Sequence, residues 1–379
     1  MLMINKNNCW RAVIIPGIIF SSVETMAETL IEYRHKETNA NSFQSSHHPR
    51  LTLSAEAIVF DRVGTATYTL VERVPGTAYF LDIPATSGSL ALKSTNLKQG
   101  FSPGYRLGAA YRFDSNHDVL FSFFHIDDWN STRSIGPDNP PNWLIMRAPG
   151  GFFQTQDFTY QSMTWGYSTK LYNAELNVQK KFHNRIVILV GFRWLQLREN
   201  LLGIIQPRDL IKPTWKSYPK ADLAYVKWFE GQPGIPAPVY PPFWNTSATN
   251  NLYGLQIGVD GKLFERSSFF LNGLVKIGGY LNHATESTGV SIAKVVYNSR
   301  ALTNQSAFVG EAGLQCAYQI TNNIALKLSY EVLWLTNIAT APGQIQKTYS
   351  TQSSVNALGV NSASNVFFNG GTVGLELSF

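Results

Sequence analysis

The fold is decided by a stretch that runs Tyr172-Asn-Ala-Glu-Leu-Asn-Val-Gln-Lys-Lys-Phe182, then His183-Asn-Arg185, then Ile186-Val-Ile-Leu-Val-Gly-Phe-Arg-Trp194. In both longer runs, apolar side chains recur at almost every second position, and polar ones such as Glu175 and Arg193 fall between them. Because successive side chains of a strand point to opposite faces, each run predicts a strand with one apolar and one polar face. The short polar link predicts a tight hairpin between them.

The same pattern recurs after residue 50 and predicts ten strands in all. They cover 51–60, 101–113, 118–127, 157–182, 186–199, 251–264, 268–281, 305–320, 324–338 and 366–379. Four connections are short polar turns, at 114–117, 183–185, 265–267 and 321–323. Five are long and rich in Pro, Gly, Asn and Ser, at 61–100, 128–156, 200–250, 282–304 and 339–365. Short periplasmic turns that alternate with long external loops are typical of outer-membrane barrels.

Composition restricts the fold class further. Charged residues make up 15% of the chain and aromatic residues 13%, which is little charge for a soluble domain. Beyond the first 27 residues, no apolar run approaches the roughly 18 residues that a spanning helix needs. Since only helices and closed barrels satisfy their backbone in lipid, we predict an all-β fold, a closed antiparallel transmembrane β-barrel of about ten strands. The alternative is a soluble β-sandwich, whose strands would also show alternating apolar and polar residues.

Three segments divide the chain. Residues 1–27 have the features of an export signal: Lys6 and Arg11, a short apolar core, and the small residues around Ala27. The alternative is an irregular N-terminus before a soluble domain. Residues 28–50 are polar, and we predict a periplasmic segment outside the barrel wall, which comprises 51–379. Cys316 is the single cysteine beyond the signal, so no internal disulfide can form there.

The last residues, Thr372-Val-Gly-Leu-Glu-Leu-Ser-Phe379, alternate and stop at a phenylalanine. A terminal aromatic strand of this kind resembles the signal that the bacterial outer-membrane assembly machinery reads. We therefore expect that machinery and outer-membrane lipid as partners, and localisation in the bacterial outer membrane. The small, scattered excess of basic residues gives no reason to expect nucleic acid.

A family resemblance supports this class. It is carried by 251–258 (Asn-Leu-Tyr-Gly-Leu-Gln-Ile-Gly), 307–314 (Ala-Phe-Val-Gly-Glu-Ala-Gly-Leu), 326–335 with Ala341-Pro342, and two shorter matches at 175–177 and 191–194. These segments resemble beta-barrel porin family seven, outer-membrane proteins of planctomycete-like bacteria. The resemblance covers roughly the C-terminal half. It implies an outer-membrane barrel with a transport role, and no catalytic or ligand residues come with it.

Strand parity directs a set of charged side chains into the lumen. The candidate network is Glu175, Arg193, Lys181, Arg106, Arg112, Asp260, Lys276, Glu311, Lys327 and Glu331, with Glu56, Lys262 and Glu376 on the same face. Ten strands lie close to the size that side chains alone can fill, so these charges predict a salt-bridged interior. The other interpretation is a narrow, weakly selective pathway. Trp194, Trp334 and Phe379 are the candidates for an aromatic girdle.

Catalytic, cofactor and metal sites are not predicted. His125, Asp127 and Asp128, with His283, could form a protease-like group at the outer rim. A general base must face a substrate cleft, whereas parity with the neighbouring phenylalanines points His125 toward lipid. The turn that begins at Asp114 lacks the glycine and distal glutamate of a calcium loop.

Two functions of different classes follow. The first is a porin-like barrel with at most a narrow pathway for small solutes or ions. The alternative is a surface barrel whose long loops bind an external partner, with aromatic and amide side chains at Trp215, Tyr218, Trp228, Tyr240, Trp244 and Asn245.

Two structural predictions follow as well. A three-residue turn at 183–185 would pair residues whose numbers sum to 368, placing Glu175 opposite Arg193. The filled interior predicts that the isolated barrel conducts poorly.

Overall fold

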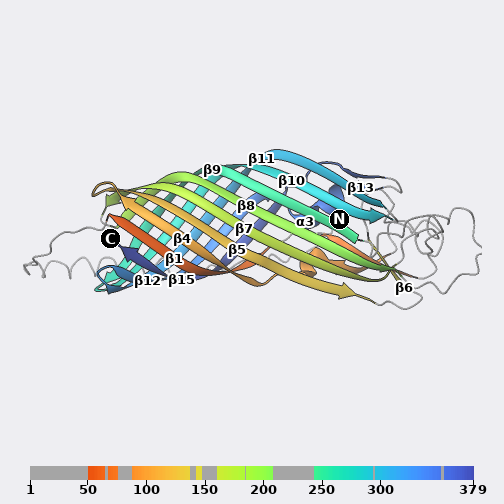
Figure 1. Cartoon of the computed structure of the whole chain (residues 1–379), viewed down its shortest axis with the longest axis horizontal. Helices are drawn as coiled ribbons and strands as arrows, with labels where there is room; N and C mark the ends of the chain where they lie inside the picture. Colours follow the sequence, from red (N-terminus) through yellow and green to blue (C-terminus); the bar gives the residue numbers. More distant parts are fainter. Residues whose placement is uncertain are drawn as a thin grey trace, which may run out of the picture. The chain divides into compact units, whose positions relative to one another are not determined.

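The wall of the protein is a closed ring of ten antiparallel strands (Figure 1). The computed structural model describes residues 50–64, 67–75, 88–136, 142–146, 160–183, 185–207, 243–292, 295–350 and 354–379. The wall strands are β1 (Leu51–Val63), β4 (Phe101–Arg112), β5 (His117–Ile135), β7 (Tyr160–His183), β8 (Ile186–Pro207), β9 (Phe243–Arg266), β10 (Phe269–Ile292), β11 (Val295–Thr321), β12 (Ile324–Ile338) and β15 (Ser364–Ser378). Because β1 pairs with both β4 and β15, the ring closes, and the predicted fold class and strand number are confirmed.

The chain's last strand forms the closing seam. The backbone N–H of Phe379 donates to the Leu51 carbonyl at 2.8 Å, and the Phe379 carbonyl accepts from Arg50 at 2.7 Å. Residues 1–49, which include the predicted signal and nearly all of the predicted periplasmic segment, lie outside the described residues.

Shorter elements connect the wall strands at the long-loop end. They are β2 (Thr69–Pro75), β3 (Ser89–Lys93), η2 (Ser94–Asn96), β6 (Asn142–Ile145), α3 (Ala341–Gln344), η5 (Ile345–Lys347), β13 (Thr348–Ser350) and β14 (Val355–Ala357). The hairpin of β2 and β3 joins the wall through β6, which pairs with β2 and, at one position, with β7. In the part of the chain described, no helix is long and apolar enough to cross a membrane.

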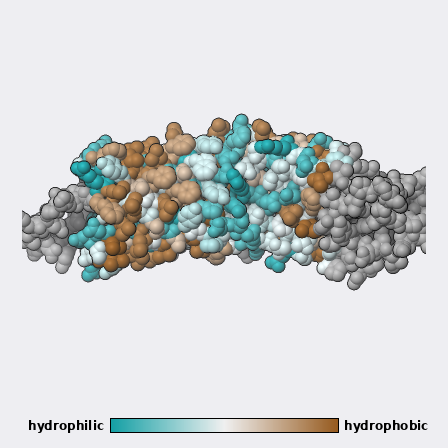
Figure 2. All heavy atoms as spheres, in the orientation of Figure 1, coloured by the Kyte–Doolittle hydropathy of each residue, from teal (hydrophilic) through white to brown (hydrophobic). Residues whose placement is uncertain are grey.

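An apolar belt surrounds the part of the barrel near the short turns. We call the outward apolar side chains of this part the belt. On β7 and β8 they include Leu176, Val178, Val190 and Phe192, each 47–53% exposed. Figure 2 shows the apolar colours gathered over this half of the barrel. Since a membrane-spanning strand needs about 9–11 residues, the run from Ile186 to Trp194 is long enough to cross the hydrocarbon.

Several strands continue well beyond the belt, and here the predicted strand ends are wrong. Residues 282–304 were expected to be a loop, yet β10 runs to Ile292 and β11 starts at Val295. In the same way, β5 and β8 end later and β9 starts earlier than predicted. We call this upper wall the extension. Most of its outward side chains are polar, as Arg198 and Asn200 are on β8, which is why its composition resembles that of a loop.

The register of β7 and β8 is as predicted, although the turn is not. Lys181 pairs with Val187 and Glu175 with Arg193, so the numbers sum to 368. His183, however, pairs with Ile186, and a bulge between Lys181 and His183 shifts the ladder by one residue. The turn is therefore shorter than expected. The bulge supplies the extra residue that keeps lipid-facing side chains opposite each other.

Candidate functional site

Four ion-paired side chains form the centre of the lumen within the belt. Arg193, on β8, is 1% exposed and lies 3.5 Å from Glu175 on β7 and 2.8 Å from Glu311 on β11. Lys276, on β10, bridges the same two carboxylates at 3.0 Å and 2.9 Å. Buried charges persist when they are paired and hydrogen-bonded. Two cations and two anions meet that condition here, and their charges cancel.

Amide side chains complete the coordination of Glu175. Asn173 and Asn177 each donate to it at 3.1 Å, and Gln256 of β9 donates at 2.8 Å. Asn173 also accepts from Arg193 at 2.5 Å. All three amides are at least 95% buried. The charged centre is thus a connected polar network rather than a row of separate ion pairs. Among the described residues, only Nη2 of Arg193 has no hydrogen-bond partner within this group of side chains.

A second cluster lies on the other side of the lumen. Arg106 of β4 makes a two-pronged contact with Glu331 of β12, at 2.6 Å and 2.5 Å, and lies 3.4 Å from Glu56 of β1. Lys327 lies 3.5 Å from Glu56 and 3.2 Å from Glu376. This bidentate geometry is the strongest form of an arginine–carboxylate contact.

The remaining predicted network residues are separate. Arg112 and Lys181 both contact Asp118, at 3.2 Å and 3.8 Å, near the short turns. Asp260 lines a cavity of about 190 Å³ at the same end, together with Glu56, Lys276, Glu311 and Lys327. The lumen therefore starts at the short-turn end as a small charged cup and is closed above it by the ion-paired groups.

An apolar layer lies above the charges. It contains Phe60, Phe124, Trp129, Leu195 and Phe368, each no more than 3% exposed. The Trp129 ring stands 5.2 Å from that of Phe368, and its Nε1 donates to the Phe60 carbonyl at 2.8 Å. The layer consists of large side chains from strands on several sides of the ring. It fills the barrel where the belt ends.

A loop segment enters the lumen above this layer. The segment from Ala339 to Lys347, which contains α3 and η5, joins β12 to the short strand β13. Asn250 of β9 holds it through two hydrogen bonds with the Ala339 backbone, both 2.8 Å. Glu199 of β8 accepts from the Ala341 N–H at 2.9 Å and also binds Arg62 and Tyr167. Side chains of the wall therefore fix this segment inside the extension.

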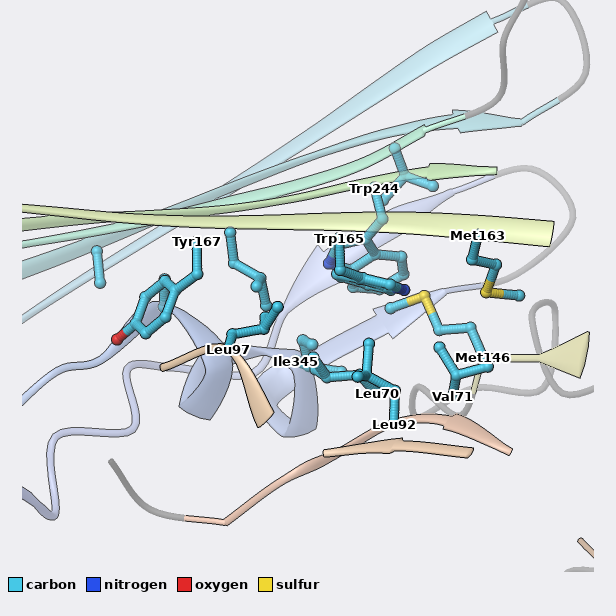
Figure 3. Packing of buried hydrophobic residues seen from close by; sticks show 14 of the residues in the cluster. Leu70, Val71, Leu92, Leu97, Met146, Met163, Trp165, Tyr167, Trp244 and Ile345 are labelled. Carbon is cyan, nitrogen blue, oxygen red and sulfur yellow. The ribbon is translucent and has the colours of Figure 1, made fainter. Parts of the chain in front are cut away.

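The interior of the extension is apolar. Figure 3 shows Trp165 and Trp244 of the wall strands directed toward Ile345 of η5 and Leu70 of β2, with Met163 beside Met146. Trp244 is 0% exposed, so it is a core residue and not part of the exposed recognition surface that the alternative function would use. Gly203 of β8 makes room for Trp165, since a Cβ there would lie 2.8 Å from its ring. The other predicted loop aromatics lie outside the described residues.

The rim histidine lies on the outer surface. His125 of β5 stacks on Tyr172 with ring centroids 4.3 Å apart, and its Nδ1 is 3.7 Å from Asp127. His283, on β10, contacts Asn304 at 2.7 Å instead. In the described structure, His125 therefore lies beside Asp127, but the two histidines do not share a site. Among the described residues, no group of three His, Cys, Asp or Glu side chains gathers as a metal site.

The predicted girdle residues all face outward. Trp334 is 44% exposed, and its ring meets that of Phe308 at 5.8 Å. Trp194 ends the apolar run on β8, next to Tyr253 of β9. Phe379 is 64% exposed at the short-turn end of the seam. Aromatic side chains therefore stand at both edges of the belt, where a girdle is expected.

A polar cluster of Arg62, Tyr167 and Glu199 was not predicted from the sequence. Arg62 donates to the Tyr167 hydroxyl at 2.8 Å, and that hydroxyl donates to Glu199 at 2.7 Å. Arg62 had been assigned to a loop. It stands in fact one residue before the end of β1, and its parity with Phe60 could have placed it in the lumen.

Known proteins are similar to this chain in fold, but they do not assign it to a family. No family model matches the chain, and no curated protein matches it. Solved structures are similar in fold at low identity. The outer membrane protease OmpT from Escherichia coli is 10% identical, with a TM-score of 0.45, over 90% of this chain and 99% of that chain. The translocator domain of the autotransporter NalP from Neisseria meningitidis is 8% identical, with a TM-score of 0.38, over 96% and 99%.

The toluene transporter TbuX from Ralstonia pickettii is similar at 8% identity and a TM-score of 0.33, over 88% and 90% of the two chains. The resemblance to beta-barrel porin family seven stays a prediction. The ring of strands and the belt themselves show a transmembrane β-barrel of the bacterial outer membrane.

Proposed function

We propose that the protein is an outer-membrane barrel closed to general diffusion, whose extension offers an extracellular surface to a partner and whose belt is the anchor. The filled lumen is the observation that carries this proposal. Conduction needs a continuous wet path. Along the described wall, ion pairs, the apolar layer around Trp129 and the segment Ala339–Lys347 follow one another instead.

A narrow, porin-like pathway is the second candidate, and one observation favours it. The segment Ala339–Lys347 belongs to a loop, and hydrogen bonds from Asn250 and Glu199 hold it. Moving it would break few sheet contacts. A route from the extension toward the charged cup would then require only that the apolar side chains below it rearrange.

Conductance in planar bilayers tests both candidates. The unmodified protein should show no steps on the nanosiemens scale of open porins. Asn250→Leu keeps the branched shape of the side chain and removes both hydrogen bonds to Ala339, so it should produce brief openings if the pathway exists. Thr249→Leu, the outward neighbour on the same strand, is the control and should stay silent. Nanosiemens steps from the unmodified protein would contradict the closed lumen.

Labelling of intact cells tests the anchor role. In a Cys316→Ser background, a cysteine at outward Ser168 of the extension should react with a membrane-impermeant maleimide. The matched Val178→Cys variant, in the belt, should not react. Failure of Ser168→Cys to react would mean that the extension is not exposed to the medium. The proposed role is not enzymatic, and peptide cleavage by the purified barrel that is lost in His125→Ala would contradict that part of the proposal.

A further inference from the structure

A patch of charged and aromatic side chains lies on the outer surface where the belt ends on β7 and β8. Lys170 and Arg198 are directly paired across these two strands. Both face outward, because their neighbours Leu171 and Glu199 are buried in the lumen. Below them on the same face are Tyr172 and Trp194, the uppermost aromatic side chains of the belt. The two cations therefore stand at the height of the lipid headgroups.

Two like charges directly opposite each other on a sheet disfavour pairing unless an anion lies between them. Lys170 has Asp128 at 3.1 Å. Arg198 has no carboxylate partner in the described part of the chain, and its guanidinium stands over the Tyr172 ring at 5.9 Å. The patch thus holds one cation that is fixed in place and free to bind an anion.

The surroundings offer acceptors and flat apolar surface as well. Asp127, whose side chain is 69% exposed, stands beside His125. Gln196 donates to Asn251 at 2.5 Å on the same outer face. Tyr172 and His125 are stacked, and Tyr105 packs edge-on against His125 at 5.9 Å. The formal charges of Lys170, Arg198, Asp127 and Asp128 cancel. A simple anion finds little net attraction here, whereas a ligand with phosphate, hydroxyl and amide groups finds a partner for each.

We infer that this patch binds the phosphorylated sugar headgroup of a glycolipid in the outer leaflet. Phosphate would accept from Arg198 and Lys170, sugar hydroxyls would donate to Asp127 and Asp128, and acyl chains would lie along Tyr172 and Trp194. Basic side chains at the membrane surface are the usual recognition elements for lipid phosphates. Charge complementarity and continuity with the belt both favour a lipid over a soluble partner.

Binding to the detergent-folded protein tests the inference. The probes are purified lipopolysaccharide, the same glycolipid after dephosphorylation, phosphatidylglycerol vesicles and inorganic phosphate. Lipopolysaccharide should bind, and the combined variant Arg198→Gln, Lys170→Gln should weaken it by roughly tenfold or more, as expected for lost charge-assisted hydrogen bonds. Arg300→Gln is the matched control. Arg300 is exposed on β11 and pairs with Ser287, well above the belt, so its loss should leave binding unchanged.

Each of three results would overturn the inference: an unchanged affinity in the combined variant, an equal loss in Arg300→Gln, or equal binding of the dephosphorylated glycolipid. Equal binding of phosphatidylglycerol, or competition by inorganic phosphate at the same concentration, would reduce the patch to an unspecific anion site and also contradict the assignment. The unfolding temperature of each variant without lipid shows that it is folded.

Discussion

The belt and the extension are built from the same strands, yet they place their apolar side chains on opposite faces. On β8, Val190 and Phe192 face outward below Trp194, with Arg193 inside. Above it, Arg198 faces outward, with Leu195 and Leu197 inside. The strand keeps its geometry across this point. What changes is the solvent outside, from hydrocarbon to water, and the hydrophobic pattern shifts by one residue.

The shift leaves a mark in the sequence, since two adjacent apolar residues occur where the patterns meet. Such pairs are Leu171-Tyr172, Trp194-Leu195, Leu252-Tyr253, Tyr280-Leu281 and Leu333-Trp334. In each pair the leucine or aromatic residue that faces the lumen is buried, and its neighbour faces outward at the top of the belt. These pairs lie on five strands and locate the outer membrane surface. In the belt, charges must pair inside the barrel, and in the extension the inside can be an ordinary apolar core.

The largest expected effect concerns Arg193. Arg193→Met should destabilise the barrel by about 3–5 kcal/mol, because Glu175 and Glu311 stay buried with Lys276 as their one remaining cation. The measurement is the free energy of unfolding by urea in detergent micelles. Arg300→Met, which removes an exposed arginine of the extension, should cost less than about 1 kcal/mol. Equal effects of the two variants would show that the central ion pairs do not support the belt.

A charge on the outer face distinguishes the two regions directly. Leu176→Arg, in the middle of the belt, should cost about 2–4 kcal/mol in a lipid bilayer. Ser168→Arg, on the outer face of the same strand in the extension, should change the stability by less than about 0.5 kcal/mol. Reversible unfolding from vesicles measures both. If Ser168→Arg costs as much as Leu176→Arg, the hydrocarbon reaches higher than the apolar pairs indicate.

The sequence predicted the belt well and the extension poorly, for one physical reason. Alternation with apolar residues outward is easy to recognise, so the strand centres, the closed ring and the pairing of Glu175 with Arg193 follow from it. In the extension most outward positions are polar and the connections are rich in turn-forming residues, so the sequence of segments such as 282–304 predicts loops. The adjacent apolar pairs could have shown that the alternation of apolar residues moves to the other face of the strand at these positions, and that the strand itself does not end there.

Contacts across the lumen were beyond the sequence analysis. Parity alone directs Arg106 and Glu331 inward, but these residues are 225 positions apart and their contact depends on how the ring closes. The hydrogen bonds between Asn250 and the Ala339 backbone depend on a loop that returns into the barrel. Neither follows from a local pattern, because the stagger between strands decides which side chains meet.

A pH dependence is expected in the extension. Glu286 lies above the belt on β10, points inward and is 1% exposed. Thr288 donates to its Oε2 at 3.1 Å, while its Oε1 has no hydrogen-bond partner in the described part of the chain. Burial without a cation raises the pKa of this carboxyl to about 7. The folded protein then holds a proton that the unfolded chain releases above its ordinary pKa of 4.5.

The direction of the pH dependence follows from the difference in proton binding between the folded and unfolded states. Stability from this group is fully present below about pH 4.5, declines as the pH rises to about 7, and is constant above it. Glu286→Gln should remove that decline and stabilise the protein at pH 8 by up to about 3.5 kcal/mol, since the pKa is raised from 4.5 to about 7 and each pKa unit corresponds to about 1.4 kcal/mol. Unfolding temperatures of both proteins between pH 4 and 8 measure the difference. Glu265→Gln, at the exposed end of β9, is the control and should leave the curve unchanged. If the curves of Glu286→Gln and the unmodified protein run parallel, the carboxyl is already ionised in the folded barrel, and water reaches the core of the extension.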